Sequence, residues 1–238
     1  MSNIAIIFAG GTGKRMNTKT RPKQFLELHG KPILVYTLEK FQDHPEIDGI
    51  VLVVLEQWID TCRSLIDQYH LDKVRSVIAG GSTAMHSQRN GLEKAAELYG
   101  TDCTVLIHDG VRPLIDADTI SRNIASVKTR GSAITVAPAI ETITIKTDSG
   151  EIGEIIERSR VELARAPQSF RLRDILDAHD KAASEGREFI DSASMMKHYG
   201  HPLFSVQGPP ENIKITTPND YYMFKALIDA DENSEVFG

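Results

Sequence analysis

Glycines and basic residues are concentrated near the start of the chain, directly after a short apolar run over residues 4–8. The sequence over residues 8–24 is FAGGTGKRMNTKTRPKQ. Because glycine lets the backbone turn sharply, such a loop leaves backbone N–H groups uncovered. Uncovered N–H groups next to fixed cations such as Arg15 and Lys23 favour an anion, most simply a polyphosphate. A strand-to-helix turn that needs its glycines for geometry alone is the other interpretation.

Two better-known phosphate motifs do not fit this loop. A P-loop has Ser or Thr directly after its lysine, whereas here Gly13 is followed by Lys14 and Arg15. A Rossmann fingerprint opens a helix with three spaced glycines, and Met16 stands where the third would be. The loop therefore predicts a phosphate site of another kind.

A second candidate constellation is Asp109 and Arg112 in the segment IHDGVRP. A carboxylate at the end of a buried strand commonly holds Mg²⁺ together with phosphate oxygens, although it can also cap a turn. We expect Arg112 to bind a phosphate through two of its N–H groups at once. The alternative is a surface ion pair with Asp116. We expect His108 to be a buried core residue rather than a general base.

Weaker signals come from two other parts of the chain. The loop over residues 80–87, GGSTAMHS, offers hydroxyls and free backbone groups for a nucleobase or ribose, although Gly-Ser turns are common. Lys214 lies in NIKIT, which predicts a short strand, and its side chain either adds a cation to the site or points to solvent. Arg158, Arg160 and Arg165 are candidates for binding a second phosphate, and we expect at least one to be an ordinary surface residue.

Many cations, a carboxylate and no evident nucleophile fit the transfer of a nucleotidyl group to a phosphate. The acceptor phosphate is already ionised at neutral pH, so no base is required. Fixed cations and Mg²⁺ stabilise the charge that develops, and positioning supplies much of the remaining rate. A hydrolase fits less well, because the chain has no G-x-S-x-G elbow and neither Cys62 nor Cys103 lies in a nucleophile motif.

Apolar runs and amphipathic segments alternate through most of the chain. This alternation predicts a mostly parallel, Rossmann-like α/β sheet with helices on both faces, whose sites lie beyond the carboxyl ends of the strands. The expected strands are residues 4–8, 50–55, 74–79, 104–108 and 133–137, with helices between them.

Residues 142–157 break this pattern. TITIK over residues 142–146 alternates as a half-exposed strand does, a turn follows at 148–150, and residues 152–157 predict a returning strand. A lone hairpin is marginal in water, so it is expected to pack on a second subunit or on its own domain.

Composition sets wider limits. The chain has 238 residues, 41% of them hydrophobic, with a net charge of −6, two isolated cysteines and no apolar run long enough to span a membrane. These features predict one domain over residues 1–238, a cytoplasmic location without a signal peptide, and no nucleic-acid or membrane partner.

Six segments occur in the order that one enzyme family shows: AGGTGKRM with PKQF, GGS…S, HDGVRP, APQSF, FIDSAS and NIKIT-TP. Together they resemble the sugar nucleotidyltransferases, and more narrowly the cytidylyltransferases that act on methylerythritol phosphate and ribitol phosphate. The resemblance implies CTP, a polyol phosphate and Mg²⁺ as ligands. It also implies that residues 139–160 form a protruding β-arm through which the protein is a homodimer.

The resemblance also implies roles for individual residues. The catalytic cations would be Arg15, Lys23 and Lys214. The nucleotide would contact Ala9, Gly10, Gly11, Gly13, Gly81, Ser82, Ser87 and Gly110, with Gly110 near the ribose. The acceptor side would use Asp109, Arg112, Thr142 and Arg158, of which Asp109 also positions Mg²⁺ and the last two come from the partner's arm.

Some positions depart from the methylerythritol phosphate enzymes. Those enzymes usually have the motifs A-A-G, H-D-A-A-R, D-R and T-P-Q, and they have an Asp in the loop that corresponds to residues 80–87, which we call the base loop. This chain has Ala9-Gly10-Gly11, Gly110-Val111, Glu157-Arg158, Ala166-Pro167-Gln168 and Ser82 at those places. The A-G-G form is more similar to the ribitol phosphate branch. We therefore expect transfer of CMP from CTP to D-ribitol 5-phosphate, giving CDP-ribitol and pyrophosphate. The alternatives are the same reaction on 2-C-methyl-D-erythritol 4-phosphate and, more distantly, a non-catalytic nucleotide-binding module.

Overall fold

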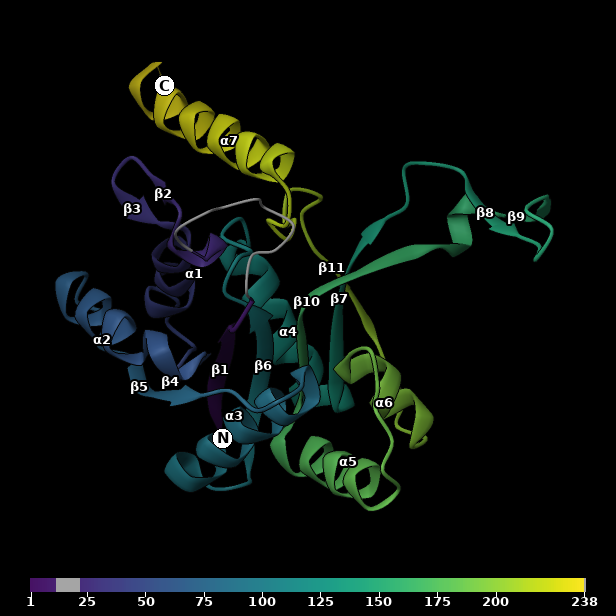
Figure 1. Ribbon diagram of the computed structural model, residues 1–238, viewed down its shortest axis with the longest axis horizontal. Coiled ribbons are helices and arrows are strands. Elements are labelled where there is room, and N and C mark those ends of the chain that lie inside the picture. The colour runs from purple at the N-terminus through teal and green to yellow at the C-terminus, as the bar shows by residue number, and fades with distance from the viewer. Residues whose placement is uncertain (12–21, 238) are drawn as a thin grey trace.

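A seven-stranded sheet forms the centre of the molecule (Figure 1). The computed structural model describes residues 1–11 and 22–237, of which residues 232–237 are described by their backbone. In spatial order the strands are β11 (Ser205–Gln207), β7 (Ser132–Pro138), β10 (Glu162–Arg171), β6 (Cys103–Asp109), β1 (Ser2–Ala9), β4 (Gly49–Val54) and β5 (Val74–Ala79). All neighbouring pairs are parallel except the two that β10 makes with β6 and β7.

Helices cover both faces of this sheet, as the sequence predicted. One face packs on α3 (Ala84–Tyr99), α5 (Leu172–Ser184) and α6 (Ser192–His198), and the other on α1 (Ile33–Gln42), α2 (Ile59–Gln68) and α4 (Ala117–Arg130). Strand β1 shows why both faces need cover, because its successive side chains point to opposite faces of the sheet. Ile4 and Ile6 belong to one apolar cluster, and Ala5 and Ile7 belong to the other. The continuous apolar run in β4 is fully buried for the same reason.

Two segments differ from the prediction. Strand β10 was not predicted, since Pro167 argues against a central strand. Its register on β7 shifts between Ala164 and Gln168, so the proline lies in an irregular segment that does not need its N–H. The predicted strand over residues 212–216 is wrong, because its backbone is held by loop and side-chain hydrogen bonds and not by a strand ladder.

The predicted hairpin is confirmed. It consists of β8 (Ile143–Lys146) and β9 (Ile152–Ile156), is followed by η4 (Arg158–Arg160), and extends away from the sheet (Figure 1). Several of its apolar side chains are exposed, including Ile152 and Ile155.

The last helix, α7 (Pro218–Phe237), closes a small apolar cluster near the carboxyl ends of the strands. Its Phe224 packs with Val111 and Ile215, so the helix supports the loop after β6 and the 212–216 segment. The short elements between β1 and α1 are η2 (Lys23–Phe25), β2 (Glu27–Leu28) and β3 (Lys31–Pro32), and η3 (Glu56–Trp58) precedes α2. Among the described residues, no helix combines the length and apolar character that crossing a membrane requires.

Candidate active site

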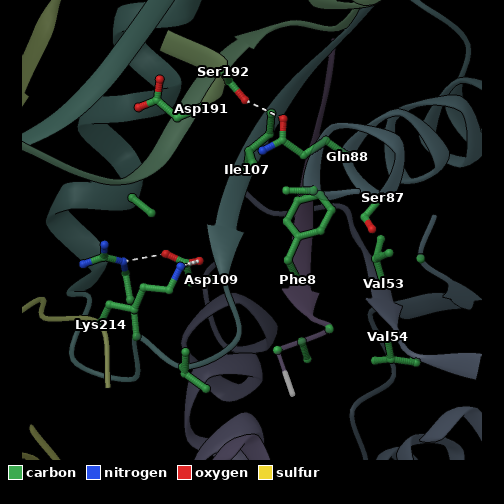
Figure 2. Close-up of a pocket in the computed structure, with 18 of the residues that line it drawn as sticks. Phe8, Val53, Val54, Ser87, Gln88, Ile107, Asp109, Asp191, Ser192 and Lys214 are labelled. Carbon is green, nitrogen blue, oxygen red and sulfur yellow. Dashed lines mark hydrogen bonds and ion pairs between the residues drawn. The ribbon is translucent and has the colours of Figure 1, made fainter. Parts of the chain in front are cut away.

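A cavity of about 640 Å³ opens where the strands end. Its walls come from the loop after β1, from η2, from the loop between β5 and α3, from the end of β6, and from β10 and the start of α6 (Figure 2). A volume of this size is typical of a site for a nucleotide or a similar small molecule. The three loops that the sequence placed beyond the strands therefore meet at one cavity.

A group of charged side chains forms one side of this cavity. Asp109 ends β6, and its Oδ2 accepts from Arg112 Nε at 2.8 Å while its Oδ1 accepts from Lys214 Nζ at 2.6 Å. Burial alone would raise the pKa of Asp109, but the charges of Lys214 and Arg112 outweigh it and lower the pKa to about 2. The carboxylate is therefore ionised at any physiological pH and holds two cations in place.

Two buried cations fix the segment that carries Lys214. Arg112 NH1 donates to the carbonyl of Asn212 at 2.9 Å, and Lys23 Nζ donates to the carbonyl of Ile215 at 2.8 Å. The predicted alternative for Arg112, an ion pair with Asp116, does not form. Asp116 instead accepts from the backbone N–H of Thr119 and begins α4.

The loop after β5 forms the opposite side, and its hydroxyls hold the loop in shape. Ser87 Oγ accepts from the N–H of Gly81 at 3.0 Å and donates to the carbonyl of Thr83 at 2.9 Å. Ser82 Oγ pairs with His86 Nδ1 at 2.8 Å. Gly81, Ser82 and Ser87 all line the cavity, so the structure brings the predicted base-loop residues together.

The first loop contributes backbone to the same cavity. Ala9, Gly10 and Gly11 line it, and Gln24 Nε2 donates to the carbonyl of Ala9 at 2.7 Å. Gly13 and Arg15 lie outside the described residues. Lys23 lies next to this loop, since a side chain on Gly11 would meet Cε of Lys23 at 3.5 Å.

Gly110 does not line the cavity. A Cβ there would come within 2.9 Å of Leu34 and 3.1 Å of the Phe8 carbonyl, so close packing accounts for this glycine. Its contact with the ribose remains a prediction.

His108 is the buried core residue that the sequence predicted. Its Nε2 lies 3.1 Å from the carbonyl of Arg112, and its ring packs against Phe41. Burial lowers the pKa of His108 to about 4, despite the hydrogen bond to Arg112. A neutral, enclosed imidazole of this kind is not placed to exchange protons with a substrate.

Thr142 and Arg158 lie on the arm, away from the cavity of their own chain. Arg158 NH1 donates to the carbonyl of Ile140, which ties η4 to the base of the arm. Neither residue lines the cavity.

Sequence reasoning missed several polar side chains of the cavity wall. Ser192 Oγ donates to Gln88 Oε1 at 3.0 Å and so joins α6 to α3 (Figure 2). Gln168 Nε2 donates to Asp191 Oδ2 at 2.9 Å. Arg165, on β10, was noted only as one of three arginines. The segments APQSF and FIDSAS contain or adjoin most of them, but their positions near Asp109 follow from the tertiary fold.

The donor set fits a Mg²⁺ ion held mainly by substrate phosphates. Among the residues that the structure describes, no three His, Cys, Asp or Glu side chains form a group that could hold a metal. Asp109 and Asp191 are the carboxylates that line the cavity within the described chain. Magnesium commonly takes one or two carboxylates together with phosphate oxygens, which is the arrangement that Asp109 allows.

Fold and cavity together define an α/β protein with a cationic, nucleotide-sized site at the carboxyl ends of parallel strands. A family model, IspD: 2-C-methyl-D-erythritol 4-phosphate cytidylyltransferase, matches residues 3–230. The chain is 52% identical to a ribitol-5-phosphate cytidylyltransferase of Streptococcus agalactiae serotype V, with 100% of each chain covered. It is 50% identical to a protein of the same name from Vibrio parahaemolyticus, covering 99% of this chain and 100% of the relative.

A solved structure, the 4-diphosphocytidyl-2C-methyl-D-erythritol synthase of Anaerococcus prevotii, superposes with a TM-score of 0.83 at 25% identity. The match covers 96% of each chain. The chain belongs to the IspD family of cytidylyltransferases. The predicted enzyme class is thereby confirmed.

Proposed function

We propose that this enzyme transfers CMP from CTP to D-ribitol 5-phosphate, giving CDP-ribitol and pyrophosphate. The observation that carries the proposal is that the base loop and the Asp109–Arg112–Lys214 group face one another across a single cavity. The acceptor follows the full-length relatives at 50–52% identity, which carry the ribitol-5-phosphate name.

In this reaction an oxygen of the acceptor phosphate attacks the α-phosphorus of CTP. A new P–O bond forms, the bond between the α-phosphorus and the bridging oxygen breaks, and pyrophosphate leaves with that oxygen. No proton has to be removed from the nucleophile, so a site without a general base suffices. The enclosed position of His108 agrees with this requirement.

The protein's task is to bring two anions together and to stabilise the charge on the leaving group. Lys23, beside Gly11, and Arg15 would contact the triphosphate. Arg112 and Lys214, oriented by Asp109, would face the acceptor. Bound Mg²⁺, held by phosphate oxygens with Asp109 beside it, would neutralise part of the negative charge.

The arm supports a homodimer in this proposal. A two-stranded hairpin is marginal alone, and this one exposes Ile145, Ile152 and Ile155. Pairing with a second copy would bury these side chains and bring Thr142 and Arg158 to the partner's acceptor side. Light scattering on the purified enzyme tests this part, and a monomer at all concentrations would contradict it.

The acceptor is tested by measuring pyrophosphate release with CTP and Mg²⁺. D-Ribitol 5-phosphate and 2-C-methyl-D-erythritol 4-phosphate are compared at matched concentrations. We expect ribitol 5-phosphate to give the higher kcat/KM, and turnover of methylerythritol phosphate alone would refute the choice. CTP binding without turnover of either acceptor would favour the non-catalytic alternative.

A further inference from the structure

Arg165 is a cation of the cavity wall. The sequence named it only as one of three candidates for a second phosphate, and the proposed reaction gives it no role. It lies on β10, where the register on β7 shifts between Ala164 and Gln168. Strand β10 pairs with β6 as far as Gln168, which is opposite Ile107, and Asp109 lies two residues further along β6. Arg165 therefore emerges at the end of β6 that carries Asp109, and both residues line the cavity.

Unlike Arg112 and Lys214, Arg165 has no counter-charge among the residues that the structure describes. Its side chain is half-buried, its Nε is enclosed without a hydrogen-bond partner, and it makes no ion pair with any residue in the described parts of the chain. Arg112 and Lys214 share Asp109. Asp191 is engaged elsewhere, since it accepts from Gln168 and caps α6.

The surroundings of Arg165 favour an anion. Burial lowers the pKa of Arg165, and the positive charge of nearby Arg112 lowers it further. The described lining has four cations, namely Lys23, Arg112, Arg165 and Lys214, against the carboxylates of Asp109 and Asp191, which leaves a formal charge of +2. An enclosed guanidinium beside another cation is costly unless an anion joins it.

The strand order indicates which anion this is. Arg165 lies on β10, whereas the glycine loop follows β1 and the base loop follows β5, on the other side of β6. A nucleotide that uses both loops occupies the β1–β5 side of Asp109. The space beside β10 is then left for the acceptor.

We propose that Arg165 binds the phosphate of the acceptor polyol phosphate and so contributes to recognition of that substrate. This inference rests on the proposed function, which supplies a nucleotide on the β1–β5 side of the cavity and a polyol phosphate as the acceptor. The planar guanidinium suits a phosphate, because two of its N–H groups can donate to two phosphate oxygens at once. Arg165 would thus hold the nucleophile while Lys23 and Arg15 hold the triphosphate.

The test compares Arg165→Leu and Arg165→Lys with Arg171→Leu. Arg171 is an exposed arginine at the opposite end of the same strand, so it serves as the matched control. Initial rates are measured against acceptor at saturating CTP and against CTP at saturating acceptor. We expect Arg165→Leu to raise the acceptor KM about ten- to hundredfold, the scale of one lost hydrogen bond between charged groups. The CTP KM should change less than about twofold, Arg165→Lys should recover part of the loss, and Arg171→Leu should match the wild type.

Two kinetic outcomes would overturn the proposal. An unchanged acceptor KM in Arg165→Leu would show that the residue does not contact the acceptor. An equal or larger rise in the CTP KM would assign it to the triphosphate. Thermal unfolding of each variant separates these outcomes from misfolding, and if Arg165→Leu does not fold, Arg165→Lys is compared with the wild type instead.

A binding measurement keeps the test independent of turnover. Inorganic phosphate is titrated calorimetrically into enzyme saturated with the α,β-methylene analogue of CTP, which occupies the nucleotide side. We expect phosphate to bind the wild type and Arg171→Leu alike and Arg165→Leu at least about tenfold more weakly. Equal affinity in all three would refute the assignment, even if the proposed acceptor had already failed.

Discussion

Replacing Asp109 by Asn removes the charge that holds Arg112 and Lys214 while keeping nearly the same side-chain shape. Asp109 is one-quarter exposed, and its two ion-pair contacts measure 2.8 and 2.6 Å. Lowering its pKa from 3.8 to about 2 corresponds to about 2 kcal/mol of folding free energy at neutral pH. We expect Asp109→Asn to lower the free energy of unfolding by that amount at pH 7.

How the stability difference between the wild type and Asp109→Asn depends on pH follows from the direction of the pKa shift of Asp109. A carboxylate whose pKa is lower in the folded state stabilises the fold above its unfolded pKa, near 3.8, and stops doing so as the pH falls through its folded pKa. The difference between the wild type and Asp109→Asn should therefore be full above about pH 5. It should fall to about half near pH 3 and to about one-sixth near pH 2, and it should disappear near pH 1.

Urea unfolding of the two proteins, followed by circular dichroism at several pH values, measures this difference. Acid effects at other sites cancel, because wild type and variant are compared at the same pH. Asp60→Asn is the control, since Asp60 forms an exposed ion pair with Arg63 and should change stability by less than about 0.5 kcal/mol. If Asp109→Asn were as stable as the wild type at pH 7, or if the difference did not depend on pH, the argument from charge would be refuted.

Three further predictions concern catalysis and packing. Lys23→Ala should lower the maximal rate of pyrophosphate release roughly a hundredfold or more, the scale of a lost transition-state charge contact, and an unchanged rate would remove Lys23 from the mechanism. Arg158→Ala should raise the KM for the acceptor and leave CTP affinity nearly intact in calorimetry, whereas an equal loss of CTP affinity would show that the arm was wrongly assigned. Gly110→Ala should lower the unfolding temperature by the equivalent of about 1–3 kcal/mol, because the new Cβ would come within 3.1 Å of the Phe8 carbonyl. A variant as stable as the wild type in thermal unfolding would show that the loop after β6 can yield.

The parallel part of the sheet could be predicted from the sequence because its signals are local. Strands β1, β4 and β6 are mainly runs of apolar residues, and each is followed by turn residues that show where it ends. Buried parallel strands require such runs, so the periodicity alone carries the information. The same locality made the arm predictable, since alternation and a turn define a hairpin.

Strand β10 could not be predicted in the same way. It contains a proline and two arginines, and its central position depends on pairing with β6 and β7, far away in the sequence. The irregular register near Pro167 makes that pairing possible, and no local pattern specifies it. The error at residues 212–216 arose in the opposite way. The sequence there does alternate as a strand does, but side chains of Arg112 and Lys23 donate to its carbonyl groups in place of a neighbouring strand.

The site was predictable to the extent that its residues directly follow strands. Asp109 and the base loop belong to that class, because the carboxyl ends of parallel strands meet at one edge. The pair formed by Gln88 and Ser192 joins residues 104 positions apart, and a pairing of that kind follows from tertiary structure alone.

The cavity is divided along β6, and this division bears on how the acceptor is selected. In the proposed function, CTP lies at the ends of β1, β4 and β5, and the acceptor lies beside β10, the start of α6 and Lys214, all of which line the cavity. Ala166 replaces the threonine of the methylerythritol phosphate enzymes and lies next to Arg165 on the proposed acceptor side. At this place the chain therefore lacks a hydroxyl group and has an arginine whose Nε is without a hydrogen-bond partner. Ser82 is a departure on the CTP side, and its hydroxyl is bonded to His86 within the same loop. Because the two sides come from separate strands, we expect substitutions on β10 to change the acceptor preference without weakening CTP binding.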